Sequence, residues 1–414
     1  MGLEGRRVLY ISYTGMLDPL GQSQVLPYLR ELAKRGIRFT LISFERPATL
    51  ADVGLEKCEA LRHQLAAANI TWHWLRYHQK PSLPATAYDV VAGIRFALAL
   101  VKRDQIELVH ARSHIPATIA LALKKRTGIK MIFDVRGLMA EEYVDAEHWQ
   151  QKSIAYRLTK TMERRAWAVS DGVFTLTENI WPIISSWDGL RSRNVEHSVI
   201  PCCIDLDSFT FNAADRERRR RELNLGDRFT LIYSGSIGGW YLSEKMADFF
   251  VQLLKRIGNA YFLWLTPGDP KVITSLMNER SINPTHYLIK KLAPADVPSY
   301  LSAGDAGIAF YKPGFSKLAT SPVKVSEYLA CGLPPIINTG IGDSDALAKK
   351  FNVGSLVNEF NSQEYDRVAA EMEKLVYHPE VRARVRAVAE SLFDLRRVGA
   401  RRYASLYERV LNRN

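Results

Sequence analysis

The chain has 414 residues, of which 47% are hydrophobic and 24% are charged. A chain of this length is expected to hold two or three domains, since a domain usually has about 100 to 200 residues. The composition excludes intrinsic disorder, collagen-like chains and small disulfide-rich proteins. The 56 Lys and Arg residues against 44 Asp and Glu residues give a formal net charge of +12, which favours an anionic partner such as a nucleotide phosphate, a nucleic acid or a membrane surface.

The four cysteines of the chain are Cys58, Cys202, Cys203 and Cys331. They form no CxxC pair and no metal-ligand spacing, so the sequence predicts no disulfide framework and a reducing, cytoplasmic location. Residues 1–7 lead directly into a short apolar strand, so we expect no signal peptide. The most apolar stretches, 90–101 and 115–123, are shorter than the roughly 18 residues that a spanning helix needs, and we expect no membrane-spanning segment.

Short β-branched runs alternate with amphipathic stretches, and this alternation predicts βαβ units with parallel sheets. The first series of strands and helices is expected at residues 8–12, 22–35, 39–43, 52–67, 108–110, 116–127, 131–135 and 153–169. The second series is expected at residues 230–234, 243–257, 261–265, 287–289, 295–302, 307–310, 324–331 and 335–338. The sequence therefore predicts an α/β protein with two doubly wound halves.

A hinge is predicted between the two halves, at residues 200–209, and we place the domain boundary near residue 203. This gives an N-terminal domain of residues 1–203 and a C-terminal domain of residues 204–394. The last segment, 395–414, has apolar residues at helical spacing and no strand after it. It is predicted to be a terminal helix that packs on another part of the chain.

A glycine-containing loop follows the first strand of each half, where open parallel sheets bind their ligands. In the first half, Gly21 and Gln22 open a helix whose backbone amides suit a phosphate or a sugar hydroxyl. In the second half, the strand ends at Ser234, and Gly235 and Gly238 follow it. A plain glycine turn explains either loop alone, but the matching pair predicts a ligand held between two nucleotide-binding domains.

Residues 319–334 contain the sharpest local pattern of the chain. Ser321 followed by Pro322 predicts the start of a helix, with Ser321 as its N-cap. Lys324 and Glu327 then lie one turn apart near the positive end of that helix, where the dipole and the ammonium group together favour a diphosphate. Glu327 can accept hydrogen bonds from vicinal ribose hydroxyls. A surface Lys–Glu pair is the alternative, but the helix follows a strand, which favours the functional interpretation.

Polar residues also end two consecutive strands of the first half. His110 and Arg112 end one strand and Arg136 ends the next, so these side chains are expected at a binding site. Two Asp-x-Asp stretches, 205–207 and 343–345, are assigned to the hinge and to a helix start, so no metal site is expected.

The order of these features resembles the GT-B glycosyltransferases of the family-4 type, which are retaining, nucleotide-sugar-dependent enzymes of bacterial polysaccharide assembly. The resemblance is carried by His110 and by residues 21–24, 133–137, 199–209, 234–235 and 321–332. These segments follow the family's order over nearly the whole chain, and the last of them is the most specific.

The resemblance implies two Rossmann-like domains that face a central cleft, with the C-terminal helix crossing back to the first domain. It implies that a nucleotide-diphospho-sugar donor is bound by Gly21, Gln22, Ser234, Gly235, Gly238, Thr320, Ser321, Lys324 and Glu327. Lys324 matches the residue that holds the diphosphate, Glu327 the residue that holds the ribose, and His110 a histidine near the donor sugar, so these three are the expected catalytic residues. Arg112 and Arg136 are expected to contact the acceptor or the sugar.

The implied reaction moves a sugar to a glycan or polyprenyl-linked acceptor of a bacterial O-antigen, capsule or exopolysaccharide. No cofactor and no metal are expected, because Lys324 and the helix dipole can stabilise the departing diphosphate. No nucleic-acid partner is expected, because the basic residues are dispersed. The resemblance also implies a cytoplasmic enzyme with peripheral contact to the cytoplasmic membrane, for which the basic run 218–221 is a candidate surface.

The sequence departs from the family pattern in two places. Ala319 stands where the family often has a glutamate eight residues before Glu327, so sugar contacts must come from backbone amides or from Thr320. The segment 238–241 replaces the Arg and Lys that commonly follow the glycine loop, and Lys245 is a candidate substitute. These departures leave open an inactive subunit that only binds donor. A nucleotide-sugar 2-epimerase is a second alternative, because it would share the sheet and the phosphate site.

Overall fold

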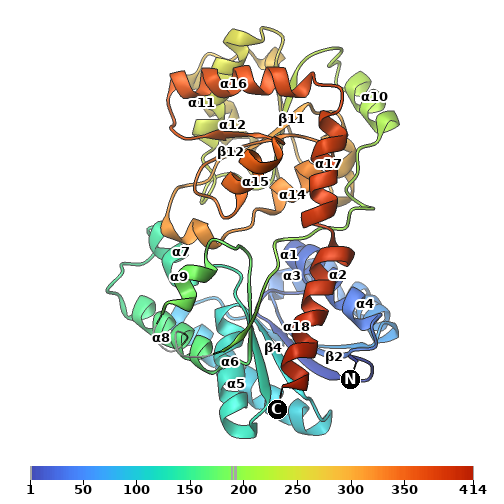
Figure 1. Cartoon of the computed structure of the whole chain (residues 1–414), viewed down its shortest axis with the longest axis vertical. Coiled ribbons are helices and arrows are strands. Elements are labelled where there is room, and N and C mark those ends of the chain that lie inside the picture. Colours follow the sequence, from blue (N-terminus) through green and yellow to red (C-terminus); the bar gives the residue numbers. More distant parts are fainter. Residues whose placement is uncertain (1, 188–189, 191–193, 414) are drawn as a thin grey trace. The chain divides into compact units, whose positions relative to one another are not determined.

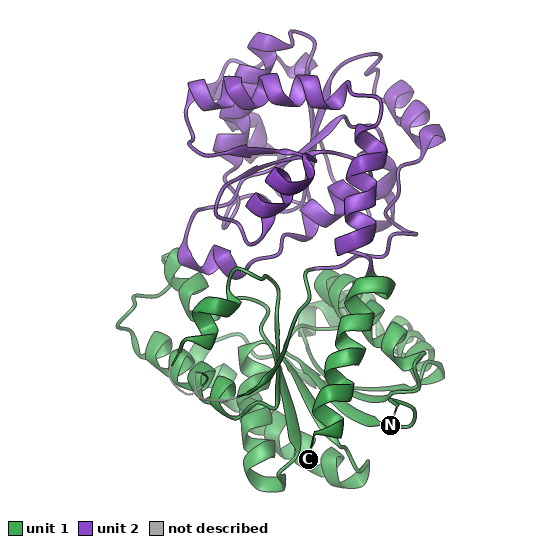
Figure 2. Ribbon diagram, in the orientation of Figure 1, with its two compact units in different colours: residues 1–201, 395–414 green, residues 202–394 purple. Residues whose placement is uncertain are grey.

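The computed structural model describes residues 2–187, 190 and 194–413 (Figure 1). The chain divides into two compact units. Unit 1 contains Met1–Pro201 and Leu395–Asn414, and unit 2 contains Cys202–Asp394 (Figure 2). The chain passes from unit 1 to unit 2 two residues before the predicted boundary at 203, and it returns to unit 1 at Leu395.

A seven-stranded parallel sheet forms the centre of unit 1, in the order β3-β2-β1-β4-β5-β6-β7. The strands are β1 (Arg7–Ser12), β2 (Arg38–Glu45), β3 (Ile70–Arg76), β4 (Leu108–Arg112), β5 (Lys130–Asp134), β6 (Gly172–Thr175) and β7 (Glu196–Val199). The order reverses between β1 and β4, which makes the sheet doubly wound. Sequence analysis missed β3, β6 and β7, because β3 alternates poorly and the other two have only four residues each.

Helices cover both faces of this sheet. They are α1 (Pro19–Gln24), α2 (Leu26–Ala33), α3 (Pro47–Val53), α4 (Leu55–Ala67), α5 (Ser82–Arg103), α6 (His114–Thr127), α7 (Met139–Asp145), α8 (Ile154–Val169), α9 (Trp181–Ser185) and α18 (Arg401–Asn412). The single helix predicted at 22–35 is two helices, because the backbone breaks at Val25 (φ −124°, ψ −65°) and a proline opens α2. A π-helical turn, Leu395–Ala400, precedes α18.

The apolar stretch 90–101, which we expected to be too short to span a membrane, lies within a longer helix. This helix, α5, is the longest in the described chain. Its 22 residues make it the one helix among the described residues that is long and apolar enough to cross a membrane by length and composition. In unit 1 it packs against α6. Gly93 permits this contact, because a Cβ atom there would lie 2.6 Å from the Ile119 side chain and 3.2 Å from Phe44.

Unit 2 contains a six-stranded parallel sheet in the order β10-β9-β8-β11-β12-β13. The strands are β8 (Thr230–Ser234), β9 (Tyr261–Leu265), β10 (Tyr287–Lys290), β11 (Ala306–Ala309), β12 (Pro335–Asn338) and β13 (Ser355–Val357). The helices are α10 (Ala213–Glu222), α11 (Ser243–Arg256), α12 (Pro270–Glu279), α13 (Val297–Ser302), α14 (Val323–Ala330), α15 (Ser344–Phe351), α16 (Ser362–Val376) and α17 (Val381–Leu392). The order again reverses, here between β8 and β11.

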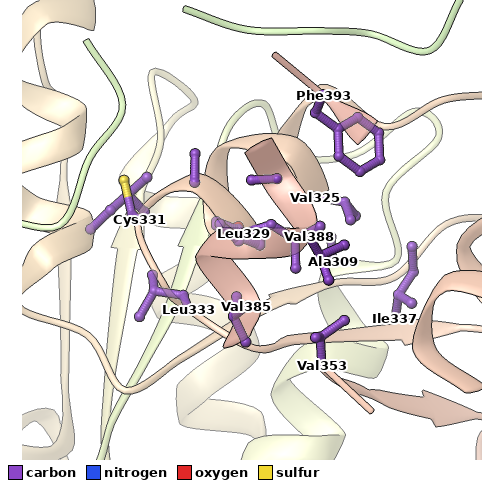
Figure 3. Packing of buried hydrophobic residues seen from close by; sticks show 14 of the residues in the cluster. Ala309, Val325, Leu329, Cys331, Leu333, Ile337, Val353, Val385, Val388 and Phe393 are labelled. Carbon is purple, nitrogen blue, oxygen red and sulfur yellow. The ribbon is translucent and has the colours of Figure 1, made fainter. Parts of the chain in front are cut away.

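The core of unit 2 has one apolar layer on each face of the sheet. Figure 3 shows the layer that holds α14, in which Val325 and Leu329 of α14 meet Val385 and Val388 of α17. Leu329 and Val385 are fully buried. This packing fixes α14 on the sheet and therefore fixes the polar residues at its N-terminal end.

Candidate functional site

A buried tyrosine of α14 aligns the helix with the carboxyl ends of β8 and β11. The Tyr328 hydroxyl accepts a hydrogen bond from the backbone N–H of Ser234 (2.9 Å) and donates one to the carbonyl oxygen of Ile308 (3.2 Å). Ser234 ends β8 and is 8% exposed. Because one side chain bonds to both strands, the first turn of α14 lies beside the loop that follows β8.

Lys324, in the first turn of α14, passes directly over Gly235. A Cβ atom at position 235 would lie 2.5 Å from Cε and 2.6 Å from Nζ of Lys324, and the φ of Gly235 is +135°. A side chain cannot be placed there without displacing the lysine. The sequence placed both residues at the donor site, and the structure brings them together.

The Lys324 ammonium group lies among aromatic rings. Its Nζ atom is 3.7 Å from the centroid of the Tyr241 ring and 5.5 Å from that of Tyr233. Lys324 is only 8% exposed, and within the described residues its ammonium has no hydrogen-bond or ion-pair partner. A nearly buried cation that meets only ring faces is poorly compensated, so this position is suited to an incoming anion.

Glu327, one turn further along α14, forms no ion pair with Lys324. Burial raises the pKa of the Glu327 carboxyl from 4.5 to about 7, and the positive charge of Lys324 only partly opposes this rise. The alternative of a surface Lys–Glu pair is therefore wrong. Within the described part of the chain the carboxyl accepts no hydrogen bond, which leaves its oxygens available to hydroxyl donors of a ligand.

The loop after β8 is tied to the chain segment after β11. Gly238 and Gly239 both have positive φ (72° and 60°) and turn the loop back. Tyr241 then forms an antiparallel bridge with Tyr311, and the Lys312 N–H donates to the carbonyl oxygen of Trp240 (2.9 Å). This connection holds the Tyr241 ring against Lys324.

A second lysine reaches the same loop from the 3-10 helix Phe315–Ala319. The Nζ atom of Lys317 lies 3.7 Å from the centroid of the Trp240 ring, and Lys317 is 4% exposed. Sequence analysis missed this residue, because nothing local relates it to Trp240. Lys245, the expected substitute for the missing basic residues, lies on α11 instead, where it pairs with Asp248 at 3.7 Å.

Two expectations around the start of α14 are corrected. Ser321 is not the N-cap: the helix begins at Val323 without a side-chain cap, and the Ser321 hydroxyl accepts a hydrogen bond from the Cys202 N–H (3.0 Å). This hydroxyl therefore holds the segment that enters unit 2. Ala319 is buried (2% exposed) and offers no polar group, and Thr320 follows it with extended backbone.

The glycine loop of unit 1 is held by its own side chains. The Gln22 amide donates to the carbonyl oxygen of Met16 (2.6 Å), and a Cβ atom on Gly21 would lie 2.1 Å from the backbone oxygen of Gly15. The buried Glu45 carboxylate accepts the Met16 N–H (2.6 Å). Sequence analysis missed Glu45, and in the described structure Gly21 and Gln22 shape the loop.

His110 does not lie at a strand end, which corrects the expected contact with a donor sugar. The strand β4 continues to Arg112, and the His110 side chain is fully buried. Its Nδ1 is hydrogen-bonded to the Tyr407 hydroxyl of α18 (2.6 Å) and its Nε2 lies 3.2 Å from an Asp134 carboxylate oxygen. Burial lowers the pKa of this histidine, although Asp134 opposes the effect. In unit 1 His110 connects the sheet to the last helix.

Arg112 and Arg136 lie on either side of Asp134 at the ends of β4 and β5. Burial would raise the pKa of Asp134, but Arg136, at 3.7 Å, together with His110 and Arg112 holds it at about 2. Arg112 is 5% exposed, and its Nε atom has no partner among the described residues. The structure thus brings the two predicted arginines together around a carboxylate that the sequence analysis did not assign.

The two Asp-x-Asp stretches bind backbone and hydroxyl groups of their own loops. Asp205 accepts the Ser208 hydroxyl (3.0 Å), and Asp345 accepts the Gly340 N–H (3.1 Å). In residues 2–187, 190 and 194–413, no group of three or more His, Cys, Asp and Glu side chains could hold a metal ion.

Comparison with known families identifies part of the chain. The family model of the glycosyl transferase 4-like domain matches residues 21–202, which lie almost wholly in unit 1. No curated protein sequence matches the chain significantly.

Solved structures match the whole chain. Sucrose-phosphate synthase from Thermosynechococcus elongatus is 15% identical with a TM-score of 0.70, and the match covers 98% of this chain and 99% of that one. Anabaena HepE in complex with UDP and glucose is 13% identical (TM-score 0.68, 97% and 100% covered). WaaG, a glycosyltransferase involved in lipopolysaccharide biosynthesis, is 13% identical (TM-score 0.67, 96% and 99% covered). At these identities the matches establish the fold, and they confirm the predicted GT-B class.

Proposed function

We propose that the chain is a glycosyltransferase of the family-4 type, which the family-model match over residues 21–202 and the GT-B fold support. In this proposal it transfers a sugar from a nucleotide-diphospho-sugar to a glycan or polyprenyl-linked acceptor, with retention of configuration. The acceptor belongs to a bacterial cell-surface polysaccharide such as an O-antigen, a capsule or an exopolysaccharide. The enzyme works in the cytoplasm and makes peripheral contact with the membrane that carries its acceptor.

The observation that carries this proposal is the Lys324 ammonium group. It is nearly buried, faces only aromatic rings and lacks an anionic partner among the described residues. A diphosphate at the N-terminal end of α14 would compensate this charge and would also meet the positive end of the helix dipole. Glu327, one turn away, would accept hydrogen bonds from the ribose hydroxyls.

The complex of Anabaena HepE with UDP and glucose supports a nucleotide sugar as donor and makes UDP-sugars the first candidates. The description of WaaG as an enzyme of lipopolysaccharide biosynthesis supports a cell-surface glycan as product. Both proteins share the fold over nearly the whole chain, and the base, the sugar and the acceptor are left to the experiment below.

The proposed reaction depends on positioning and electrostatic stabilisation. The acceptor hydroxyl attacks the anomeric carbon from the face that the diphosphate leaves, and a phosphate oxygen of the leaving group takes the hydroxyl proton. Negative charge grows on the diphosphate as the glycosidic bond breaks, and Lys324 lies where it can stabilise that charge. We propose that the enzyme needs neither a metal nor another cofactor for this step.

The test is release of free nucleoside diphosphate from a panel of UDP-, GDP-, dTDP- and ADP-sugars, with and without EDTA. Lys324→Ala and Glu327→Ala are compared with Lys245→Ala, a matched control because Lys245 is a paired lysine on α11. We expect EDTA-resistant release from one class of donor, at least about tenfold slower in the two site variants, since a hydrogen bond to a charged group contributes roughly 1.5 to 3 kcal/mol, and unchanged in the control.

Each other outcome contradicts a stated part of the proposal. Loss of release with EDTA would refute metal independence, and equal loss in Lys245→Ala would refute the role of Lys324. Donor binding without release, with every candidate acceptor supplied, would indicate the inactive subunit that the alanine at position 319 suggests. Conversion of the donor into its 2-epimer would indicate the epimerase, and absence of any nucleotide binding would exclude the transferase.

A further inference from the structure

Exposed apolar side chains concentrate on two helices of unit 1. Twelve large hydrophobic residues are exposed among those that the structure describes, and half of them lie on α5 and α8. These six are Leu83, Tyr88, Val91, Ile154, Leu158 and Val169. Tyr88 is 63% exposed and Ile154 is 78% exposed, so these side chains lie on the outer surface of unit 1.

The two helices belong to one layer, because α6 packs against both of them (Figure 1). On α5 the buried positions include Asp89, Gly93 and Ala97, and the exposed Tyr88 and Val91 lie on the opposite side of the helix. On α8, Glu163, Ala166 and Trp167 are buried, and Ile154 and Leu158 point away from them. Both exposed stripes therefore face outward from the same side of the sheet.

The apolar character of α5 exceeds what its packing requires. Only 33% of its most apolar 18-residue window is buried, although that window is apolar enough for a membrane span. A helix that only packed on a sheet would carry polar residues on its outer side. Since its inner side is packed into unit 1, α5 can lie on an apolar surface without crossing it.

The exposed charged side chains of these three helices are all basic. The helices α5, α6 and α8 contain ten basic residues and two acidic ones, Asp89 and Glu163, each 1% exposed. Seven of the basic side chains are exposed and form no ion pair with a described residue. They are Arg95, Lys102, Lys125, Arg126, Arg157, Arg164 and Arg165.

The basic run 218–221, which the sequence suggested for lipid headgroups, is largely engaged within unit 2. Arg218 pairs with Asp215 of the same helix, and Arg219 lies over the Tyr300 ring at 4.2 Å. Arg220 donates to the carbonyl oxygen of Ala303 at 2.8 Å and to other backbone carbonyls. These side chains stabilise the fold around α10, so the docking surface is to be found elsewhere.

We propose that the outer face of the α5–α6–α8 layer docks on a bilayer that contains anionic lipids. The exposed aliphatic and tyrosine side chains enter the boundary between headgroups and acyl chains, and the seven cations that have no ion pair among the described residues meet lipid phosphates. Nucleic acid would also attract the cations, but it offers no apolar phase to Ile154, Leu158 and Val91. This inference gives the proposed membrane contact a surface, and its test requires no sugar transfer.

The test measures co-flotation of the full chain with vesicles of phosphatidylcholine alone and of phosphatidylcholine mixed with phosphatidylglycerol, at low and high salt. One variant combines Ile154→Asp with Leu158→Asp, and another combines Arg157→Glu, Arg164→Glu and Arg165→Glu. Leu55→Asp is the matched control, because Leu55 is 77% exposed and lies on α4, outside the layer. A second apolar variant, Ile154→Ser with Leu158→Ser, separates loss of docking from any effect of the new charges on folding.

We expect wild type and Leu55→Asp to bind the anionic vesicles alike and to release them at high salt. The triple arginine variant should bind about a hundredfold more weakly, since each basic residue near an anionic surface contributes roughly 1 kcal/mol. Both apolar variants should bind at least about tenfold more weakly because they lose buried apolar area.

Several results would overturn the inference: failure of the wild type to bind the anionic vesicles, equal weakening in Leu55→Asp, binding that is indifferent to phosphatidylglycerol, or preference for a random duplex RNA over the vesicles. Nucleotide binding by the same variants is also measured without vesicles. This measurement separates a failure of the membrane-docking inference from a failure of the proposed transferase. It should stay at the wild-type level, because the substituted residues lie in unit 1 and Lys324 lies in unit 2.

Discussion

Replacing Glu327 by glutamine should stabilise the ligand-free protein and weaken nucleotide binding. The carboxyl group of Glu327 is held where its charged form is disfavoured, since burial raises its pKa to about 7 and no hydrogen bond from the described residues compensates it. Glutamine keeps the shape of the side chain without the charge. If Glu327 served only to stabilise the fold, its replacement by glutamine would lower the stability. A substitution that raises stability and weakens binding is typical of a functional residue.

The magnitude follows from the pKa. The folded protein holds the Glu327 proton more tightly than the unfolded chain does, so the cost of ionisation is absent below pH 4.5, grows between pH 4.5 and about 7, and is complete above that. The rise corresponds to about 3 kcal/mol, which we reduce to about 2 kcal/mol because the residue keeps partial contact with solvent. For a unit of this size that is roughly 4 to 8 °C in melting temperature.

The assay is thermal unfolding of wild type and Glu327→Gln over a series of pH values, with nucleotide titrations at the same pH. The two melting curves should coincide at acid pH and separate above neutrality, with the variant more stable. Nucleotide affinity should rise with pH through about 7 in the wild type and be pH-independent and at least about tenfold weaker in the variant, because a charged acceptor makes the stronger hydrogen bonds.

Glu364→Gln is the matched control with the opposite sign. Glu364 is held by Arg367 at 2.6 Å, and this hydrogen bond lowers the pKa of its carboxyl to about 2. Its contribution to stability is complete above the usual carboxyl pKa and is lost toward acid pH, so glutamine there should lower the melting temperature at neutral pH. Equal stability of Glu327→Gln and wild type at all pH values, or unchanged nucleotide affinity, would refute the reasoning.

Two further variants test the geometry around Lys324 and His110. Gly235→Ala places a Cβ atom 2.5 Å from Cε of Lys324, so the lysine must move. Calorimetric titration should then give at least about tenfold weaker nucleotide binding, because a hydrogen bond to a charged group contributes roughly 1.5 to 3 kcal/mol. Unchanged affinity would show that the lysine position is not critical. Tyr407→Phe removes the 2.6 Å hydrogen bond to His110 and leaves a buried ring nitrogen unpaired, which should cost about 1 to 3 kcal/mol in urea unfolding; an unchanged midpoint would show that α18 is held by apolar packing alone.

The order of strands and helices could be predicted because its physical basis is local. The run 230–234 has three consecutive hydrophobic residues at its centre, as is typical of strands in a parallel sheet that is covered on both faces. The helix α14 follows from its helical spacing and the proline that precedes it. Gly235 and Lys324 could be placed at one site because both follow strands that end at the same edge of a parallel sheet. Short strands such as β6 were not predicted, because four residues are too few to show a recognisable hydrophobic pattern.

The contacts that decide chemistry were not predictable in this way. We predicted that a strand ends at His110, but the strand continues for two more residues. His110 therefore lies in the core and not at the expected ligand contact, and its hydrogen-bond partner Tyr407 is 297 residues away in the sequence. Ser321, with the sequence of an N-cap, is bound to Cys202 instead. Lys317 reaches Trp240 from a 3-10 helix that no periodicity indicates.

The sequence by itself determined the two βα series, the glycine loops and the Lys–Glu pair of α14, because each depends on neighbours within a few residues along the chain. Only the tertiary structure decided that Lys324 lies among aromatic rings with no ion-pair partner in the described part of the chain. It also decided that Glu327 holds its proton more tightly than a free carboxyl, and that α5 and α8 share one basic, apolar face. The charge state and exposure of a side chain depend on the low-dielectric surroundings that distant segments supply, and those surroundings exist only after the chain has folded.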